Sequence, residues 1–305
     1  MTGSYRFAID RGGTFTDVVA QLPDGQLVTA KLLSSDPAHY EDAASEAVRR
    51  IVEQHGDAPI AELRIGTTIA TNALLEREGE PCALAITAGH RDALAIGNQA
   101  RPDIFARHIE KPERLESAVV EITERVSAHG DILTSLDEAA ARRDFAQLLQ
   151  QGYRAIAIIL LHGWKYTDHE ARLAAIAREM GFAQVSVSHE VAPLIKLVPR
   201  GDTCVADAYL SPVIRAYVEQ LAARVPKTGS SAPTLRFMQS NGGLADAAAF
   251  RGKDAVLSGP AGGVVGMAQT AAQLGFDKVI GFDMGGTSTD VAHYAGGYEL
   301  TGDSV

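Results

Sequence analysis

The stretch D-R-G-G-T-F-T-D, residues Asp10–Asp17, decides the fold, because it occurs again as D-M-G-G-T-S-T-D at Asp283–Asp290. Six of the eight positions are identical, so we interpret it as the repeat of a site rather than of a domain. Each copy lies between two apolar runs, as expected of two strands joined by a glycine-rich turn. The sequence therefore predicts two β-hairpins with the same tip, which we call the first clamp (Asp10–Asp17) and the second clamp (Asp283–Asp290).

Both tips carry groups that can donate hydrogen bonds to a phosphate. Paired glycines can take a positive φ and bring backbone N–H groups together around an oxyanion, and the hydroxyl side chains add donors. Two structural turns are the alternative, since Gly, Asp and Thr are common turn residues; the presence of two near-identical copies favours phosphate binding. The predicted nucleotide-binding residues are Arg11, Gly12, Gly13, Thr14, Thr16 and Asp17, and Gly285, Gly286, Thr287, Ser288, Thr289 and Asp290.

Asp10 and Asp283 end the strands that lead into the two turns. Carboxylates at these places would repel a bare polyphosphate. We therefore expect a divalent cation between the charges, with Mg²⁺ held partly through water. Asp10 and Asp283 are the predicted catalytic residues and the predicted Mg²⁺-positioning residues.

Composition bounds the class of protein. The 305 residues suffice for about two domains of ~100–200 residues, and the 46% of hydrophobic residues favour a sizeable core over disorder. The net charge of −10 and the absence of a Lys/Arg run argue against nucleic acid or a membrane as the main partner. Two cysteines, Cys82 and Cys204, provide no disulfide framework. No signal peptide or apolar segment of ~18 residues is recognised, so we expect a cytoplasmic protein.

Between the clamps, short apolar runs alternate with helical periods, which predicts a largely parallel sheet flanked by helices. We expect one lobe with one sheet from Ser4 to about Val256, and a second lobe that begins near Lys278. Strands are predicted at Leu27–Leu33, Leu63–Gly66, Cys82–Thr87, Val119–Val126, Ala155–Leu161, Gln184–Ser188 and Thr234–Gln239. Helices are predicted at Tyr40–Gln54, Asp137–Gly152, Asp168–Met180, Arg200–Val225 with an interruption near Pro212, and Gly262–Leu274.

Three further stretches are open to two interpretations. In Gly66–Glu76, a Gly and two Thr open a helix, where they could hold an anion or cap the helix. Ser240–Gly243 follows a strand and could approach a ligand or form a turn. Ser258–Gly263 lacks the Lys-Ser/Thr ending of a P-loop, and its small residues favour tight helix packing or a hinge. The histidines at 162, 169 and 189 match no zinc spacing, so a structural or solvated role is expected.

Several motifs in combination resemble the hydantoinase A/5-oxoprolinase family: Phe7–Asp17, Gly66–Glu76, Leu257–Val264 and Gly281–Asp290, supported by Ile159–Glu170, Val187–Pro193 and Gln239–Gly243. The family is part of the actin, sugar kinase and heat-shock chaperone ATPase superfamily, in which two ribonuclease-H-like domains each supply one phosphate hairpin. The resemblance implies an α/β fold with a ribonuclease-H-like (actin-like ATPase) lobe, its mixed, largely parallel sheet flanked by helices, plus the start of a second lobe. It also implies an N-terminal hydantoinase/oxoprolinase domain over residues 1–195 and the start of a hydantoinase A domain over residues 196–305.

The resemblance further implies an ATP- and Mg²⁺-dependent hydrolase that opens a cyclic amide such as 5-oxoproline, a hydantoin or a lactam. ATP would phosphorylate the amide oxygen, which makes its carbon open to attack by water; the protein's task is positioning and charge neutralisation. A hydantoinase B-type subunit or domain is the implied partner, and an oligomer is expected. The alternatives are a ketone carboxylase of the same family, a small-molecule kinase, and a non-catalytic nucleotide-binding module.

The chain departs from the family pattern in two ways. Arg200-Gly201-Asp202-Thr203 and Asp207-Ala208-Tyr209 stand where the family usually has Arg-Thr-Ser-Thr and Asn-Ala-Tyr. If this region contacts substrate, an unusual substrate is expected. The chain also ends at Val305, before the family's adenosine-binding elements, so we expect these 305 residues alone to bind ATP weakly.

Overall fold

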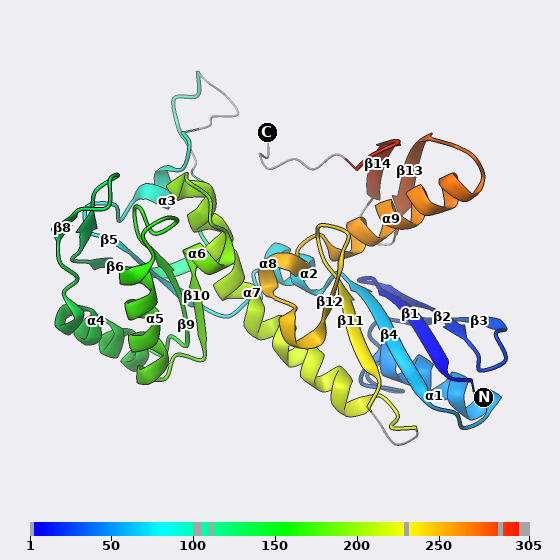
Figure 1. The fold of residues 1–305 in the computed structure, drawn as a ribbon. Helices are drawn as coiled ribbons and strands as arrows, with labels where there is room; N and C mark the ends of the chain where they lie inside the picture. Colours follow the sequence, from blue (N-terminus) through cyan, green and yellow to red (C-terminus); the bar gives the residue numbers. More distant parts are fainter. Residues whose placement is uncertain are drawn as a thin grey trace. The chain divides into compact units, whose positions relative to one another are not determined.

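The computed structural model describes residues 3–99, 105–109, 111, 113–228, 232–285 and 289–298, which form two compact units (Figure 1). Unit 1 comprises Met1–Glu76 and Ile214–Val305, and unit 2 comprises Arg77–Val213. The expectation of one lobe with one sheet from Ser4 to Val256 is therefore wrong. Each unit has its own sheet, because the chain leaves unit 1 after its fourth strand, builds a second core, and then returns.

Unit 1 contains a six-stranded sheet with the order β12-β11-β4-β1-β2-β3. Strands β1, β4 and β11 are parallel to one another, and β2, β3 and β12 are antiparallel to their neighbours. The sheet is thus mixed with a parallel centre, which places the carboxyl ends of three strands at one edge. The strands are β1 (Tyr5–Arg11), β2 (Phe15–Gln21), β3 (Leu27–Leu33), β4 (Ile60–Thr67), β11 (Thr234–Met238) and β12 (Leu244–Asp246).

One face of this sheet is buried and the other is polar. In β1, Tyr5, Phe7 and Ile9 are at most 3% exposed while the residues between them face solvent, the period of two that a half-buried strand requires. Helix α1 (Ala43–His55) packs across β1, β2 and β3. The carboxylate of Asp42 caps this helix by accepting a hydrogen bond from the N–H of Ser45 at 2.7 Å.

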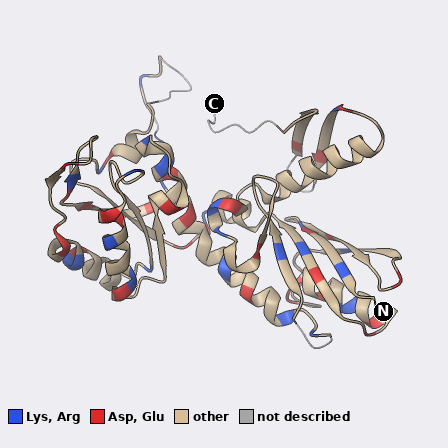
Figure 2. Cartoon of the chain, in the orientation of Figure 1, with Lys and Arg blue, Asp and Glu red and all other residues tan. Residues whose placement is uncertain are grey.

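The exposed face of the six-stranded sheet carries charges of both signs. Figure 2 shows basic and acidic residues interspersed along its strands. Glu62 is within ion-pair distance of Arg64 at 2.9 Å and of Arg236 at 3.0 Å. The charges on this face are therefore largely compensated by their neighbours.

Helix α9 (Ser258–Gln273) leads to the second hairpin, β13 (Lys278–Met284) and β14 (Thr289–Ala295), and packs against it. The helix was expected to begin near Gly262. It begins at Ser258 instead, so the glycine-rich run forms its first turns, where small residues allow close contact with β4 and β11. The remaining short elements of unit 1 are α2 (Ile69–Leu75), η1 (Ala247–Ala249) and α8 (Gly252–Ala255).

Unit 2 contains a four-stranded parallel sheet with the order β10-β9-β5-β6. Every residue of the two central strands, β5 (Cys82–Thr87) and β9 (Ala155–Ile159), is buried, which explains their unbroken apolar sequences. Helices α4 (Glu138–Gln150) and α5 (Asp168–Met180) contribute to the core on this sheet, with Phe145 and Leu173 fully buried.

The other elements of unit 2 are shorter. The strand expected at Val119–Val126 is divided into β6 (Glu116–Ile122) and the first strand of a small separate hairpin, β7 (Arg125–Val126) with β8 (Ile132–Thr134). The expected strand Gln184–Ser188 is β10 (Gln184–Val187), and Ser188 begins a helix. Two single-turn helices, α3 (Ala93–Ile96) and α6 (Ser188–Val191), complete the unit.

Helix α7 (Leu197–Arg224) belongs to unit 2 at its start and to unit 1 from Ile214 onward. The interruption expected near Pro212 does not occur, since a single helix runs through it. A proline removes one backbone donor and disfavours the helix. Burial of Leu210 and Ile214, at most 1% exposed on either side of it, outweighs this local preference.

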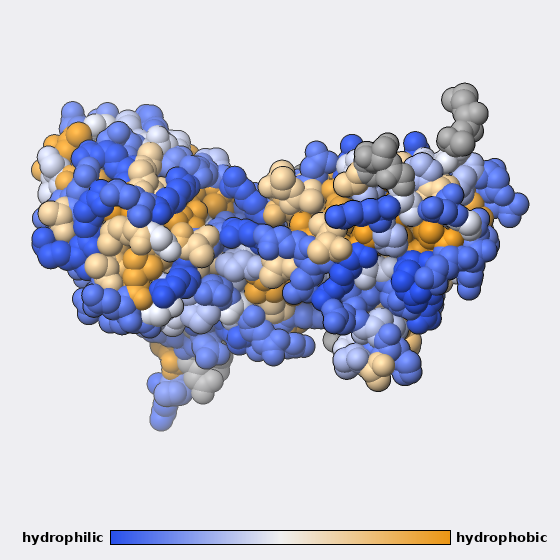
Figure 3. Space-filling model, turned by 90° about the horizontal axis from the view of Figure 1, so that it is seen from below, coloured by the Kyte–Doolittle hydropathy of each residue, from blue (hydrophilic) through white to orange (hydrophobic). Residues whose placement is uncertain are grey.

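The mixed α/β fold agrees with the expected fold class. Within the described part of the chain, no helix combines the length and apolarity needed to cross a membrane. On the face drawn in Figure 3, hydrophobic residues form separate patches between hydrophilic ones.

Candidate functional site

The two clamps have the same hairpin register. Asp10 pairs with Asp17 in the first, and Asp283 pairs with Asp290 in the second. The tip of the first clamp is closed by a hydrogen bond from the N–H of Gly12 to the carbonyl of Phe15 at 3.0 Å. Three predicted residues of the second tip, Gly286, Thr287 and Ser288, lie outside the described residues.

Glycine is needed at position 12 for space rather than for a left-handed backbone. Neither Gly12 nor Gly13 has a positive φ, unlike described glycines such as Gly25 and Gly242. The expectation of a positive φ in the first clamp is therefore wrong. A Cβ at position 12 would lie 3.0 Å from the Phe15 carbonyl oxygen. A side chain would therefore push apart the hydrogen bond that closes the tip.

Ser34 supports the loop of the first clamp through hydrogen bonds, a role that nothing in the sequence indicated. Its hydroxyl donates to the carbonyl of Gly12 at 2.6 Å and lies 3.0 Å from the hydroxyl of Thr16, and its N–H donates to the carbonyl of Thr14 at 2.9 Å. Thr16 is fully buried by this contact. Its hydroxyl therefore supports the loop, whereas Gly13 and Thr14 are exposed at the tip.

Asp17 is engaged on the surface of the same hairpin. The ammonium group of Lys31 on β3 lies 2.8 and 2.7 Å from the two carboxylate oxygens of Asp17. The same ammonium lies 4.9 Å from the ring centroid of Phe15. Lys31 therefore places a positive charge beside the first clamp and neutralises one of its two carboxylates.

Asp10 and Asp283 are brought together within unit 1. The pKa of the Asp10 carboxyl is raised, first by partial burial and then by the negative charges of Asp283 and Asp17, against which Lys31 acts. The residue nevertheless keeps a solvent-exposed surface, so a ligand can reach it. Two hairpins from opposite ends of the chain thus direct their carboxylates to one place.

Two glycines let the backbone approach these carboxylates closely. A Cβ at Gly66, at the end of β4, would lie 3.4 Å from Asp10 Oδ1, and a Cβ at Gly263 in α9 would lie 3.7 Å from Asp283 Oδ2. The site is therefore built from β1, β4, α9 and β13. It lies beside the carboxyl ends of the parallel strands, where open α/β sheets commonly bind ligands.

The carboxylates suit a divalent cation that keeps most of its water. Repulsion between Asp10 and Asp283 would be relieved by a positive ion, and oxygen ligands are those that Mg²⁺ prefers. Among the residues that the structure describes, no group of three or more His, Cys, Asp or Glu side chains could hold a metal ion. An ion here would take its remaining ligands from water or from phosphate, as is usual for Mg²⁺.

Arg11 lies on the opposite face of the sheet from Asp10, because successive residues of a strand point to opposite faces. Its guanidinium carbon is 5.4 Å from the centroid of the Tyr217 ring on α7. The side chain of Arg11 therefore lies on the face of the sheet that carries the core, whereas Gly13 and Thr14 are exposed at the clamp tip.

The stretch Gly66–Glu76 connects the first clamp to α9. The hydroxyl of Thr68 donates to the carbonyl of Arg11 at 3.3 Å rather than capping α2, and the N–H of Thr67 donates to the hydroxyl of Ser258 at 3.3 Å. The stretch Ser240–Gly243 forms the turn between β11 and β12, closed by a hydrogen bond from Gln239 N–H to the Gly243 carbonyl at 2.8 Å. Both stretches are thus held by hydrogen bonds within unit 1, and contact with a ligand stays a hypothesis for each.

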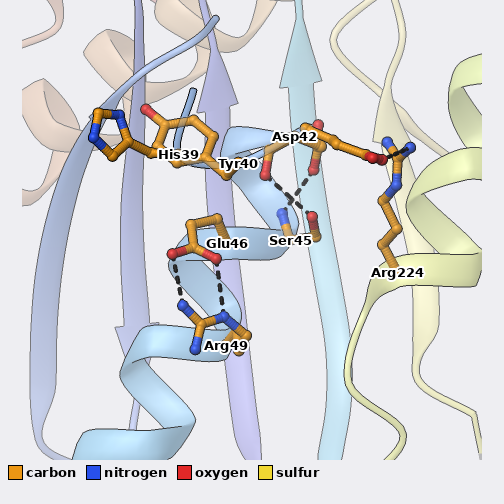
Figure 4. A pocket seen from close by; sticks show the side chains of 8 residues that line it. His39, Tyr40, Asp42, Ser45, Glu46, Arg49 and Arg224 are labelled. Carbon is orange, nitrogen blue, oxygen red and sulfur yellow. Dashed lines mark hydrogen bonds and ion pairs between the residues drawn. The ribbon is translucent and has the colours of Figure 1, made fainter. Parts of the chain in front are cut away.

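A separate cavity of about 270 Å³ opens at the start of α1 (Figure 4). Its charged groups are paired within its own wall, as Figure 4 shows for Arg49 with Glu46, and Arg224 pairs with Glu41. None of the predicted site residues lines it, so it gives no support to a nucleotide site. The lining residues are His39, Tyr40, Glu41, Asp42, Ser45, Glu46, Arg49 and Arg224.

Unit 2 has a buried polar network at the carboxyl edge of its sheet. Arg200, fully buried, donates from Nε to the hydroxyl of Ser188 at 3.0 Å and from its other nitrogens to the carbonyls of Leu160 and Leu194. The Ser188 hydroxyl in turn donates to Glu170 at 2.6 Å. Arg200 therefore ties the strand ends together, and a substrate contact by its side chain is not supported.

Two histidines of unit 2, His169, which is buried, and His189, which is half-buried, have structural partners. Nδ1 of His169 lies 2.9 Å from Glu124, and Nδ1 of His189 lies 2.6 Å from Glu170. The hydrogen bond to Glu170 raises the pKa of His189, while partial burial opposes it. The pKa of His162 is lowered, mainly by burial. The cysteines Cys82 and Cys204 are both free and buried.

Two family models cover most of the chain. The model described as the hydantoinase/oxoprolinase N-terminal region matches residues 6–181, and the model described as hydantoinase/oxoprolinase matches residues 200–304. Both clamps lie within these matches.

Known relatives are similar along nearly the whole chain. A relative from Arabidopsis thaliana, 5-oxoprolinase 1, is 44% identical and covers 97% of this chain, which in turn covers 26% of that protein. The chain thus spans about a quarter of the length of the first curated relatives that it matches.

Two solved structures have the same fold. An ATP-dependent caprolactamase from Pseudomonas jessenii has a TM-score of 0.81 at 32% identity, covering 94% of this chain and 43% of its own. A nucleotide-free acetone carboxylase has a TM-score of 0.81 at 24% identity, covering 95% of this chain and 44% of its own; at that identity the likeness concerns the fold alone.

Proposed function

Since the chain belongs to the hydantoinase/oxoprolinase family, we propose that it forms the nucleotide-binding part of an ATP-dependent hydrolase that opens a cyclic amide. The observation that carries this proposal is the meeting of Asp10 and Asp283 from two hairpins of the same register. The names of two similar proteins, 5-oxoprolinase and ATP-dependent caprolactamase, support a lactam as the substrate class.

Each part of the site has a role in this proposal. The clamp tips bind the phosphates of ATP through backbone N–H and hydroxyl groups. Asp10 and Asp283 position Mg²⁺ through water; the ion supplies charge that neutralises the phosphates. Asp10 lies partly buried beside Asp283 and Asp17, so a cation bound there would relieve the repulsion between these carboxylates.

The reaction that we propose begins with transfer of the γ-phosphoryl group to the amide oxygen. The bond between phosphorus and the oxygen of ADP breaks, and a bond between phosphorus and the amide oxygen forms. Water then adds to the amide carbon, and the C–N bond breaks as the nitrogen takes a proton, which leaves an acyl phosphate. A second water hydrolyses this acyl phosphate to a carboxylate and inorganic phosphate. The protein contributes mainly by positioning and charge stabilisation.

We propose that a hydantoinase B-type subunit or domain completes the site, in an oligomeric assembly. The two free, buried cysteines favour the cytoplasm as the compartment. The division into residues 1–195 and 196–305 stays a proposal based on sequence resemblance. The two compact units divide the chain at other places, after Glu76 and after Val213.

The test uses the full-length protein that contains these residues, with its B-type partner, and a panel of 5-oxoproline, hydantoin, caprolactam and acetone with bicarbonate. We expect one lactam or hydantoin to be opened only with Mg-ATP, with one phosphate released per ring. A stable phosphorylated product would indicate a kinase, and carboxylated ketone would indicate a carboxylase. No turnover with any substrate, in a protein that also fails to bind nucleotide, would reject the proposal.

A further inference from the structure

Four buried side-chain polar atoms among the described residues have no hydrogen-bond partner: Arg11 Nε, Glu62 Oε1, Glu116 Oε1 and Tyr217 Oη. The two glutamate oxygens still lie 3.0 and 2.7 Å from arginine nitrogens. The other two atoms belong to neighbours, since the guanidinium of Arg11 lies over the Tyr217 ring. Two unsatisfied polar groups therefore occur side by side, next to the first clamp.

This arrangement is unfavourable for the fold. Arg11 continues the row of Tyr5, Phe7 and Ile9 on the buried face of β1, where an apolar side chain is expected. A buried donor without an acceptor loses its hydrogen bonds to water and gains none in return. The ring face of Tyr217 attracts the cation but accepts no hydrogen bond from Nε. Stability alone therefore does not explain an arginine here.

The carboxylate near Arg11 and Tyr217, that of Asp42, already has a hydrogen-bond partner. Asp42 is the acidic residue that acts on Tyr217: after burial, its charge is the next cause that raises the pKa of the Tyr217 hydroxyl, while Arg11 lowers it. The carboxylate of Asp42 accepts the capping hydrogen bond from Ser45 at the start of α1. Nε of Arg11 thus remains without a partner.

The second clamp shows that the hairpin does not require this arginine. Met284 stands at the position of Arg11, directly before the two glycines, and β13 and β14 pair in the same register as β1 and β2. Only this position and that of Phe15 differ between the two copies. A feature found in one clamp and dispensable for the hairpin of the other points to a role in ligand binding.

We propose that the side chain of Arg11 has two positions, one on Tyr217, as in this structure, and one turned toward the clamp tip, where it binds a phosphate oxyanion of the nucleotide. The inference rests on the proposed function. Arg11 directly precedes Gly12 at the clamp tip, and its carbonyl stays fixed by hydrogen bonds from the N–H and hydroxyl of Thr68. Only the side chain has to move. In doing so, it exchanges a contact with a ring for charge-assisted hydrogen bonds.

The test compares wild type, Arg11→Met, Arg11→Lys and Tyr217→Phe in the full-length protein. The measurements are the thermal midpoint and the Kd for Mg²⁺ with a non-hydrolysable ATP analogue by calorimetry. For Arg11→Met, the residue of the second clamp, we expect an unchanged or higher midpoint and a Kd raised about tenfold or more, the loss typical of a charged hydrogen bond. Arg11→Lys keeps the charge and should recover part of the affinity.

Tyr217→Phe is the matched control, because it removes the unsatisfied hydroxyl and keeps the ring. We expect an unchanged or higher midpoint and no loss of nucleotide affinity. Salt provides a second readout: the affinity of wild type should fall more steeply with ionic strength than that of Arg11→Met.

Different outcomes separate this inference from the proposed function. If wild type binds the analogue and Arg11→Met binds it equally well, this inference fails and the proposed function stands. If Arg11→Met does not fold, or has a lower thermal midpoint with an unchanged Kd, Arg11 is a packing residue and the inference is overturned. If wild type binds no nucleotide, both this inference and the proposed function fail.

Discussion

Asp10 and Asp283, from hairpins at opposite ends of the chain, lie close enough for the charge of Asp283 to oppose the ionisation of Asp10, in addition to the larger effect of partial burial. Each is the next-to-last residue of a strand that leads into a glycine-rich turn. A folded protein that holds two carboxylates together in this way gains from a cation between them. This relationship connects the stability of unit 1 with its proposed chemistry.

The first prediction concerns catalysis. Asp10→Asn and Asp283→Asn should each lower ATP turnover of the full-length enzyme by about 1,000-fold, because positioned metal charge is worth several kcal/mol in the transition state. Phosphate release under saturating Mg-ATP measures this. Asp24→Asn, in the exposed turn between β2 and β3, is the matched control and should keep wild-type turnover. Wild-type rates in either site variant would remove that residue from the mechanism.

The second prediction concerns pH and stability. The folded pKa of Asp10 is raised, so its contribution to stability is fully present below the unfolded pKa of about 3.9 and is lost as the pH rises through the folded pKa. Asp10→Asn should therefore raise the thermal midpoint at pH 7 but not at pH 4, measured without Mg²⁺.

Asp17→Asn is the control for this measurement. The carboxylate of Asp17 has Lys31 as a partner, so removal of this carboxylate should not raise the thermal midpoint at pH 7. Addition of Mg²⁺ at pH 7 should raise the midpoint of wild type more than that of Asp10→Asn. An Asp10→Asn protein that is less stable than wild type at pH 7 would contradict the expected repulsion.

The third prediction concerns the buried network of unit 2. Arg200→Met should lower the free energy of unfolding by about 3–5 kcal/mol, because it removes a buried positive charge near Glu170 and leaves the carbonyls of Leu160 and Leu194 without this donor. Urea denaturation measures the loss. Arg178→Met removes an exposed arginine that lies 3.9 Å from Glu190 and should cost only about 0–1 kcal/mol. Equal effects of the two substitutions would mean that the network contributes little to stability.

The fourth prediction concerns the outer face of the second hairpin. Phe282 precedes Asp283 as Ile9 precedes Asp10, yet Phe282 is 68% exposed and Ile9 is 3% exposed. We expect Phe282 to be covered in the full-length protein. Phe282→Ser should then cost about 3–5 kcal/mol there and little in the 305-residue chain.

Ile132→Ser offers a comparison for this substitution, since Ile132 is 62% exposed in unit 2 and should be tolerated in both proteins. Urea denaturation of the four variants gives the differences. If Phe282→Ser leaves the full-length protein as stable as wild type, the hairpin face is exposed there too.

Local features of the fold were predictable from the sequence. The alternation of buried and exposed residues in β1, the unbroken apolar runs of β5 and β9, and the helices α4 and α5 follow from period and turn chemistry. The starts of helices were less accurate. Helix α9 begins at Ser258 rather than near Gly262, because its small residues, although weak helix formers, allow close packing on β4 and β11. Helix α7 continues through Pro212 because both of its sides are buried there.

The sequence by itself determined the two clamps, their strands and the class of the fold, because a strand, a turn and a short helix depend on residues near one another in the chain. Only the tertiary structure decided that residues 77–213 form a separate unit, that Asp283 meets Asp10, that Ser34 supports the first clamp, and that Arg11 rests on Tyr217. Each of these relationships joins segments far apart in the sequence. Their geometry follows from the packing of the cores and sheet edges, which no local pattern of residues specifies.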